Sequence, residues 1–170
     1  MNKGCFHLYC GDGKGKTTAA MGLALRALGH GRSVVIVQFL KSGSSGELEP
    51  LRRLGAQVFS GKGCGKFSRQ MNEEEKKEAA ALHKEHLQLA VSLKPDLLIL
   101  DEACAALRAG LLEEPLLKQV ILDRPEGQEI VVTGRRPAEW MTEAADYITE
   151  MKCRRHPFET GLPAREGVEF

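Results

Sequence analysis

The sequence predicts an α/β fold in which a mostly parallel sheet of five to six strands lies between two layers of helices. Two observations lead to this prediction. Short apolar runs rich in Val and Ile alternate with longer segments of helical periodicity, which is typical of βαβ units. A glycine-rich turn also stands between the first apolar run and the first helical segment. Because 170 residues with 42% hydrophobic side chains suffice for one core, we expect a single domain over residues 1–170.

Six short apolar runs are expected to be strands. They lie at 4–10, 33–40, 56–59, 97–101, 128–133 and 146–150. The helix after the first run is expected from Thr17 to Gly29, because apolar side chains recur there at helical spacing and a glycine-rich turn follows. The first unit is therefore strand, glycine loop, helix and strand.

The longest helix is expected at about 73–93. Asn72 and Glu75 fit a capping box, the first turn is rich in Glu, and Pro95 follows the end. Such a helix is most simply a crossover between parallel strands. Three irregular segments are expected to be site loops: 41–46, 60–70 and the tail after Lys152.

The most specific motif is the run Gly11-Asp12-Gly13-Lys14-Gly15-Lys16-Thr17-Thr18. Glycines allow backbone N–H groups to turn inward around phosphate oxygens, and the following helix N-terminus adds partial positive charge. Lys16 would neutralise a phosphate and Thr17 would ligate Mg²⁺. The alternative is a glycine turn that only links strand to helix. Cys10 stands where the usual motif has its first Gly, so the loop counted from Gly11 is one residue short.

Two further strands bring charged side chains to the sheet edge where open α/β folds bind ligands. The first of these strands ends in Asp101 and Glu102. One of the two carboxylates can hold magnesium directly or through water, and the other can polarise a water or orient the first carboxylate. Another delivers Arg135, whose planar guanidinium suits polyphosphate. The alternatives are solvated acids and a solvated arginine. With the glycine loop, these residues predict a P-loop NTPase-like (RecA-like) three-layer fold that binds ATP and Mg²⁺.

Weaker candidates are assigned structural roles. His83 and His86 lie three residues apart on the long helix and are expected to be solvated rather than metal ligands. Cys10 and Cys104 are expected to be small core residues, because no base is identifiable near either. Trp140 is expected to be a packing residue at the start of a helix.

Composition excludes several classes of partner. Lys and Arg number 24 against 23 Asp and Glu, so no general attraction to nucleic acid or an anionic membrane is expected. The five cysteines are odd in number and contain no C-x-x-C pair, which argues against a disulfide framework and a zinc ribbon. No stretch approaches the roughly 18 apolar residues of a membrane span. We therefore expect a cytoplasmic protein.

With these motifs in place, the sequence resembles the P-loop corrinoid (cob(I)alamin) adenosyltransferases of bacteria. The resemblance runs from about residue 4 to the C-terminus. Its carriers are Gly11 to Ala20, Arg26 to Gly31, Gln38 to Lys41, Leu100 to Glu102, Val132 to Arg135, Arg155 to Phe158 and Ala164 to Phe170.

The resemblance implies a homodimeric enzyme that binds Mg-ATP and a corrinoid reduced to Co(I), such as cob(I)yrinic acid a,c-diamide or cobalamin. The cobalt would attack the ribose C5′ and expel triphosphate. An electron donor such as a flavoprotein would reduce Co(II). This is substitution at carbon, in which the enzyme mainly aligns the reactants and stabilises the departing charge.

The resemblance also implies roles for particular residues. The loop from Gly11 to Thr18 would hold the polyphosphate, and Thr17 and Glu102 would ligate magnesium. The predicted phosphate contacts are Lys16, Arg26 and Arg135, and the residues predicted near the nucleotide or corrinoid are Gln38, Lys41 and Phe67.

Two features depart from the family pattern. In the loop from Gly61 to Arg69, longer members place a Phe and a Trp near the corrinoid, whereas Phe67 is the one aromatic residue here. Such apolar side chains are expected to exclude the lower axial ligand of cobalt. The N-terminal extension that covers the active site of longer members is also expected to be missing.

Other functions remain open from the residues alone. A P-loop phosphotransferase would pass the γ-phosphate to a small acceptor, release ADP and use Glu102 as a general base. A RecA-like ATPase on single-stranded nucleic acid is disfavoured by the near-neutral charge and the absence of a basic stripe with aromatics. A GTPase is disfavoured because no Asn-Lys-x-Asp or Thr-Lys-x-Asp motif occurs.

Overall fold

The computed structural model describes residues 4–41, 45–61 and 68–169. Within these residues, all six expected strands are present and form one sheet in which every neighbouring pair is parallel. The strands are β1 (Phe6–Cys10), β2 (Val34–Gln38), β3 (Gln57–Ser60), β4 (Leu97–Asp101), β5 (Glu129–Gly134) and β6 (Tyr147–Glu150). Their order is β3-β2-β4-β5-β1-β6, so the carboxyl ends of β4, β5 and β1 lie side by side.

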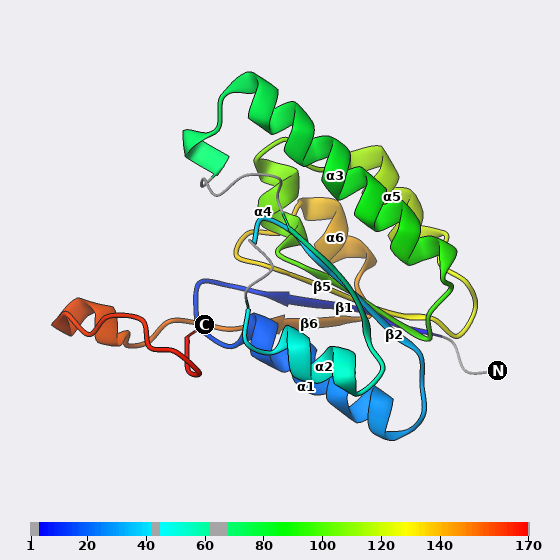
Figure 1. Cartoon of the computed structure of the whole chain (residues 1–170), viewed down its shortest axis with the longest axis horizontal. Helices are drawn as coiled ribbons and strands as arrows, with labels where there is room; N and C mark the ends of the chain where they lie inside the picture. The colour runs from blue at the N-terminus through cyan, green and yellow to red at the C-terminus, as the bar shows by residue number, and fades with distance from the viewer. Residues whose placement is uncertain (1–3, 42–44, 62–67, 170) are drawn as a thin grey trace.

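Helices cover both faces of the sheet (Figure 1). One face carries α1 (Lys16–Gly29) and α2 (Leu48–Arg53); the other carries α3 (Glu73–Ser92), α4 (Ala103–Arg108), α5 (Glu114–Leu122) and α6 (Glu139–Ala144). Because both faces are covered, β2 and β4 are buried along their whole length, which explains their continuous apolar sequences. The predicted α/β class, with three layers and a P-loop NTPase-like arrangement, is confirmed.

Two apolar cores join the layers. On the first face, α1 packs its small residues Ala20 and Ala24 against Ile36 and Ile99 of the sheet. Small side chains let the helix axis lie close to the strands, which keeps the start of α1 at the carboxyl edge. The core on the other face is larger, and its fully buried members include Phe6, Leu8, Phe39, Leu87, Leu98, Leu100, Leu117 and Met141.

The two long helices agree with their predicted bounds. α1 begins at Lys16, one residue before the expected start, and α3 spans Glu73–Ser92. The Asn72 side chain accepts the Glu75 N–H at 2.8 Å, and the Glu75 carboxylate accepts the Asn72 N–H at 2.9 Å. The capping box is therefore confirmed, and so is the crossover, since α3 joins the parallel strands β3 and β4.

The expectation that His83 and His86 are solvated is wrong. His83 is fully buried, because it lies four residues from two other buried positions of α3 on the face that packs against the sheet. Its Nδ1 lies 3.1 Å from the Leu111 carbonyl oxygen, and its ring meets the Phe39 ring edge-on at 5.2 Å. His86 is half-buried, with its ring 5.8 Å from that of Phe59.

The structural roles expected for Cys10, Cys104 and Trp140 are confirmed. Both cysteines are buried, and burial raises the pKa of the Cys104 thiol to about 12. Trp140, in the first turn of α6, packs against the larger core, and the Lys118 ammonium lies 5.4 Å from its ring centroid.

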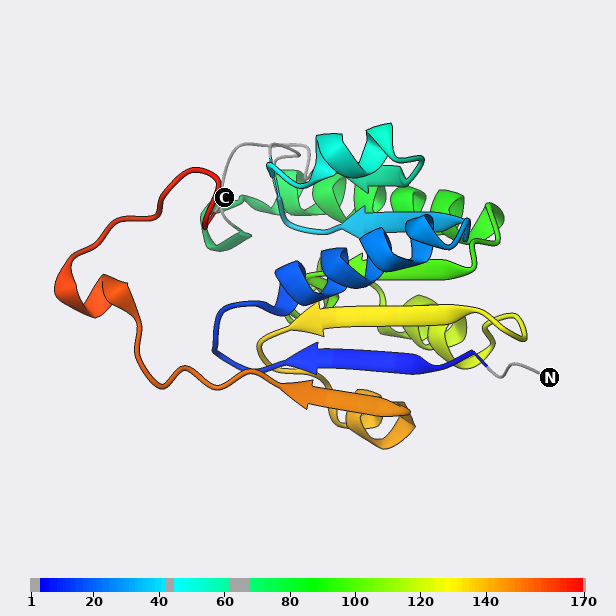
Figure 2. The same ribbon diagram turned by 90° about the horizontal axis from the view of Figure 1, so that it is seen from below.

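Beyond β6, the chain swings away from the carboxyl edge of the sheet and returns to it (Figure 2). This C-terminal tail makes one 3₁₀ turn at Pro157–Thr160, and another 3₁₀ turn, Ser68–Gln70, precedes α3. Among the helices of the described ranges, none combines the length and apolar character needed to cross a membrane.

Candidate active site

The glycine loop lies at the carboxyl end of β1 and is held by the segment that follows β6. The Gly13 N–H donates to the Met151 carbonyl oxygen at 2.7 Å. A Cβ at Gly11, whose φ is 99°, would stand 2.4 Å from the same oxygen, so only glycine fits this approach. Gly15, with a φ of 113°, ends the loop as the N-cap of α1. The N-terminus of α1 therefore opens onto the loop, where it favours an anion.

Two charged side chains of this loop have fixed hydrogen-bond partners. Lys16 is only 9% exposed, and its Nζ donates to the Gly13 carbonyl oxygen at 2.6 Å. Asp12 Oδ1 accepts the Cys153 N–H at 3.1 Å, and this hydrogen bond is the main cause of a lowered pKa for the Asp12 carboxyl. The Lys16 ammonium is thus positioned at the loop, and Asp12 ties the loop to the C-terminal tail.

Asp101, the last residue of β4, is the centre of a buried polar network. Its side chain is fully buried and receives four donors. Oδ1 accepts from the hydroxyls of Thr17 and Thr133, each at 2.8 Å. Oδ2 accepts from Gln38 Nε2 at 3.1 Å and Lys41 Nζ at 3.0 Å. Because both oxygens are engaged, Asp101 orients its neighbours, above all the Thr17 hydroxyl.

Glu102 is directed differently. Its backbone adopts φ 61° and ψ 19°, a left-handed conformation that is uncommon for a residue other than glycine. The Thr133 hydroxyl oxygen accepts the Glu102 N–H at 2.9 Å and holds this turn. The Glu102 side chain lines the cavity, and burial, followed by the charge of Asp101, raises its pKa. The ionised form of Glu102 is therefore disfavoured, and a nearby cation would stabilise it.

The cavity above these residues has a volume of about 1290 Å³. This is large for a small-molecule site. Its walls are residues 12–18 with Met21, Gly22 and Leu25, the segment 45–47 with Pro50, Leu51 and Leu54, and Leu40, Lys41, Glu102, Arg135, His156 and 167–169. Charged groups therefore gather at the loop, whereas the wall between α1 and α2 is apolar.

The donors at the cavity suit a hard divalent cation. In residues 4–41, 45–61 and 68–169, no group of three or more His, Cys, Asp or Glu could hold an ion. The Thr17 hydroxyl and the Glu102 carboxylate are oxygen donors beside the loop. Such a set suits Mg²⁺, which keeps several waters and takes other ligands from substrate phosphates.

Most residues predicted for the site are brought together. Those that line the cavity are Asp12, Gly13, Lys14, Gly15, Lys16, Thr17, Thr18, Lys41, Glu102 and Arg135. Gln38 and Asp101 are buried beside it, where they bond to each other. Arg26 does not line it, because it lies in the last turn of α1, about 15 Å along the helix from Lys16. Phe67 lies outside the described residues.

Sequence reasoning did not single out Thr133, although its hydroxyl joins Asp101 to Glu102. Nor did it assign a role to residues 167–169, which line the cavity. The available signal was weak in both cases: a lone Thr at the end of an apolar strand, and an irregular tail already expected to contribute a site loop.

Comparison with known proteins identifies the family. Residues 2–170 match the family described as ATP:corrinoid adenosyltransferase BtuR/CobO/CobP. The chain is 39% identical over 172 residues to a corrinoid adenosyltransferase of Pseudomonas aeruginosa, with 99% of this chain and 84% of that protein covered. It is 31% identical over 170 residues to a corrinoid adenosyltransferase of Escherichia coli, with 99% and 86% covered. The chain therefore belongs to the ATP:corrinoid adenosyltransferase family.

Proposed function

We propose that this enzyme transfers the 5′-deoxyadenosyl group of Mg-ATP to the cobalt of a Co(I) corrinoid and releases triphosphate. Family membership supports adenosyl transfer to a corrinoid. The observation that carries the finer proposal is the Thr17 hydroxyl, held by Asp101 beside the cavity-facing Glu102 carboxylate. The described residues give that carboxylate no hydrogen-bond donor, so it is open to a cation.

Each polar or charged residue at the loop has a distinct proposed role. Thr17 and Glu102 would hold magnesium, and Asp101 would orient the Thr17 hydroxyl by accepting its hydrogen bond. Lys16 would exchange the Gly13 carbonyl for a phosphate oxygen, because charge-assisted hydrogen bonds to an anion are the stronger ones. Arg135, at the end of β5, would contact a second phosphate.

The reaction needs alignment rather than proton transfer. Co(I) supplies both electrons of the new Co–C bond, the C5′–O bond breaks, and its electron pair leaves on the triphosphate oxygen. No proton is abstracted, so Glu102 is proposed as a metal ligand and not as a base. Lys16 and Arg135 would stabilise the negative charge that develops on the leaving group. Bound magnesium would supply further neutralisation of that charge.

The short loop supports a particular orientation of ATP. Cys10, where the usual motif has its first Gly, is buried as the last residue of β1, and the Gly13 N–H already donates to the Met151 carbonyl oxygen. The loop therefore offers few inward N–H groups, and such a cradle fits a terminal phosphate better than a bridging one. The γ-phosphate would lie in the loop, with the ribose turned toward the corrinoid.

The remaining proposals rest on the family resemblance and, for the location, on composition. We propose a homodimer, a cytoplasmic location and an electron donor such as a flavoprotein that reduces Co(II).

One experiment tests the reaction. The protein is incubated with Mg-ATP and chemically reduced cobalamin, while the spectrum is followed for a light-sensitive Co–C product. Phosphorus NMR of the completed reaction should show inorganic triphosphate equal in amount to the adenosylated corrinoid, without accumulation of ADP. Steady formation of ADP and phosphate in the absence of corrinoid would instead favour the phosphotransferase or ATPase alternative.

A further inference from the structure

A second cavity of about 540 Å³ lies between the glycine loop and the C-terminal tail. Five Lys or Arg side chains line it against one carboxylate, that of Glu169: Lys14, Lys152, Arg154, Arg155 and Arg165. The whole chain has a net charge of only +1, so this excess is local. The two cavities share Lys14, His156, Val168 and Glu169 in their walls, so they adjoin at the tail.

The end of the tail forms an ordered turn. The Glu169 carboxylate accepts from the Arg165 backbone N–H at 2.8 Å, from Arg165 Nε at 3.2 Å and from Arg165 Nη2 at 3.0 Å. These bonds lower the pKa of Glu169 to about 2 and close the segment on itself. Gly167, with a φ of 72°, allows the reversal within it.

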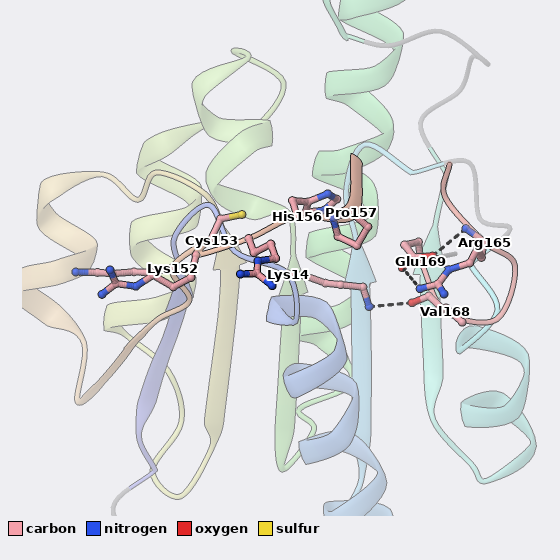
Figure 3. Close-up of a pocket in the computed structure, with 10 residues that line it drawn as sticks. Lys14, Lys152, Cys153, His156, Pro157, Arg165, Val168 and Glu169 are labelled. Atoms are coloured by element: carbon pink, nitrogen blue, oxygen red, sulfur yellow. Dashed lines mark hydrogen bonds and ion pairs between the residues drawn. The ribbon is translucent and has the colours of Figure 1, made fainter. Parts of the chain in front are cut away.

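Lys14 connects this turn to the glycine loop. Its Nζ donates to the Val168 carbonyl oxygen at 2.9 Å, across 154 residues of sequence. Figure 3 shows the Lys14 side chain extending from the loop toward Val168, beside the Arg165–Glu169 pair. Lys16, by contrast, folds back over the loop itself. The two loop lysines therefore point to different partners.

The charges of the tail favour an anion. Lys152 is paired with Glu150, and Arg165 with Glu169. Arg154 and Arg155 have no ion pair with any described residue and are exposed. Cations gathered in this way repel one another until an anion enters. The adjoining cavity contains the glycine loop and the start of α1, which form an anion site of their own.

We propose that the C-terminal tail, residues 152–169, closes over the polyphosphate of the bound nucleotide, with Lys14 holding the tail rather than contacting phosphate itself. This inference rests on the proposed function, because it takes Mg-ATP as the nucleotide. Arg154 and Arg155 would supply the tail's positive charge, and the Arg165–Glu169 pair would shape the turn that Lys14 holds.

A double-mutant cycle tests the role of Lys14, with Mg-ATP affinity measured by isothermal titration without corrinoid. The variants are Lys14→Met, a chain ending at Ala164, and their combination. If Lys14 acts through the tail, each single change should weaken binding about tenfold, and the combination should be no weaker than either. Lys16→Met combined with the truncation should instead multiply the two losses. Lys84→Met, on the exposed side of α3, serves as the matched control and should leave affinity unchanged.

Limited trypsin digestion gives a readout that is independent of affinity. Saturating Mg-ATP should slow cleavage after Arg154 and Arg155 at least about fivefold in the full chain, because ordering of a segment lowers its susceptibility. Lys14→Met, at saturating Mg-ATP, should lose this protection. The truncated chain is expected to fold, since residues 165–169 are exposed, and a thermal melt by circular dichroism checks this.

The outcomes separate the two proposals. Multiplication of the Lys14→Met and truncation losses would show that Lys14 contacts phosphate, and unchanged affinity with no trypsin protection would remove the tail from the nucleotide site. Either result overturns the inference while Mg-ATP binding stands. Failure of the wild-type chain to bind Mg-ATP would overturn the proposed function itself, together with the inference.

Discussion

Replacing Thr133 with valine tests the polar network beside the cavity. Thr133 is fully buried at the end of β5. Its hydroxyl donates to Asp101 Oδ1 at 2.8 Å and accepts the Glu102 N–H at 2.9 Å. Valine keeps the branched shape of threonine, so the change removes two hydrogen bonds without opening a cavity.

The expected cost follows from those two bonds. The Glu102 N–H loses its acceptor, which costs about 1–3 kcal/mol. The Asp101 carboxylate loses one of its donors, and a hydrogen bond to a charged group is worth about 1.5–3 kcal/mol. The added methyl group returns about 0.8 kcal/mol. We therefore expect Thr133→Val to lower the free energy of unfolding by about 2 to 5 kcal/mol.

Urea unfolding followed by circular dichroism measures this loss. Thr133→Ser keeps the hydroxyl and loses one methyl group, so it should cost only about 1 kcal/mol. Thr149→Val, on the exposed edge strand β6, is the matched control and should stay within about 0.5 kcal/mol of wild type. A Thr133→Val protein as stable as wild type, or a serine variant less stable than the valine variant, would refute the reasoning.

Four further changes test the site and its surroundings. Glu102→Gln should weaken Mg-ATP binding in isothermal titration at least about tenfold and more than Asp101→Asn, because only Glu102 lines the cavity. Burial raises the pKa of the Glu102 carboxyl. The protonated carboxyl therefore contributes stability below its ordinary pKa, and this contribution is lost as pH rises through the raised pKa. In urea unfolding, Glu102→Gln should stabilise the ligand-free protein at neutral pH and not in acid. Lys16→Ala should lower turnover at least about tenfold, and full activity of the folded variant would remove the loop from the chemistry. Burial lowers the pKa of the His83 imidazole. The neutral ring therefore contributes stability above its ordinary pKa, and this contribution is lost as pH falls through the lowered pKa. As pH is lowered from about 7 to about 5, the urea midpoint should fall more steeply for wild type than for His83→Gln. Phe67→Ala should slow adenosylation of Co(II) corrinoid supplied with a reductant but spare preformed Co(I), whereas equal loss in both assays would make Phe67 a packing residue.

The strands and the two long helices could be predicted because each carries a strong local signal. β2 and β4 are apolar runs of five residues, and α3 contains its own capping box. The helices α2 and α4 have only six residues each and α5 has nine. Fewer than three turns give little periodicity to distinguish a helix from a loop, so these helices were not predicted.

The candidate site was predictable where one segment carries the whole motif. The glycine loop is such a segment, and the structure places it at the carboxyl end of β1. Thr133 depends instead on strand order: Leu100 pairs with Val132, so the next residues along β4 and β5, Asp101 and Thr133, become neighbours. That order is a property of the assembled sheet. His83 was misjudged for a similar reason, since its burial depends on which face of α3 meets the sheet.

The strain at Glu102 shows why the residue pattern alone, without the family resemblance, did not separate the two adjacent carboxylates. In a regular strand, Asp101 and Glu102 would point to opposite faces. Here β4 ends at Asp101, and the backbone of Glu102 turns to a positive φ, which costs roughly 1–2 kcal/mol for a residue with a Cβ. Asp101 thereby stays buried among its four donors, while Glu102 reaches the cavity. Glycine at 102 would relieve the strain but remove the carboxylate, so the strained turn agrees with the proposed role of Glu102 as a metal ligand.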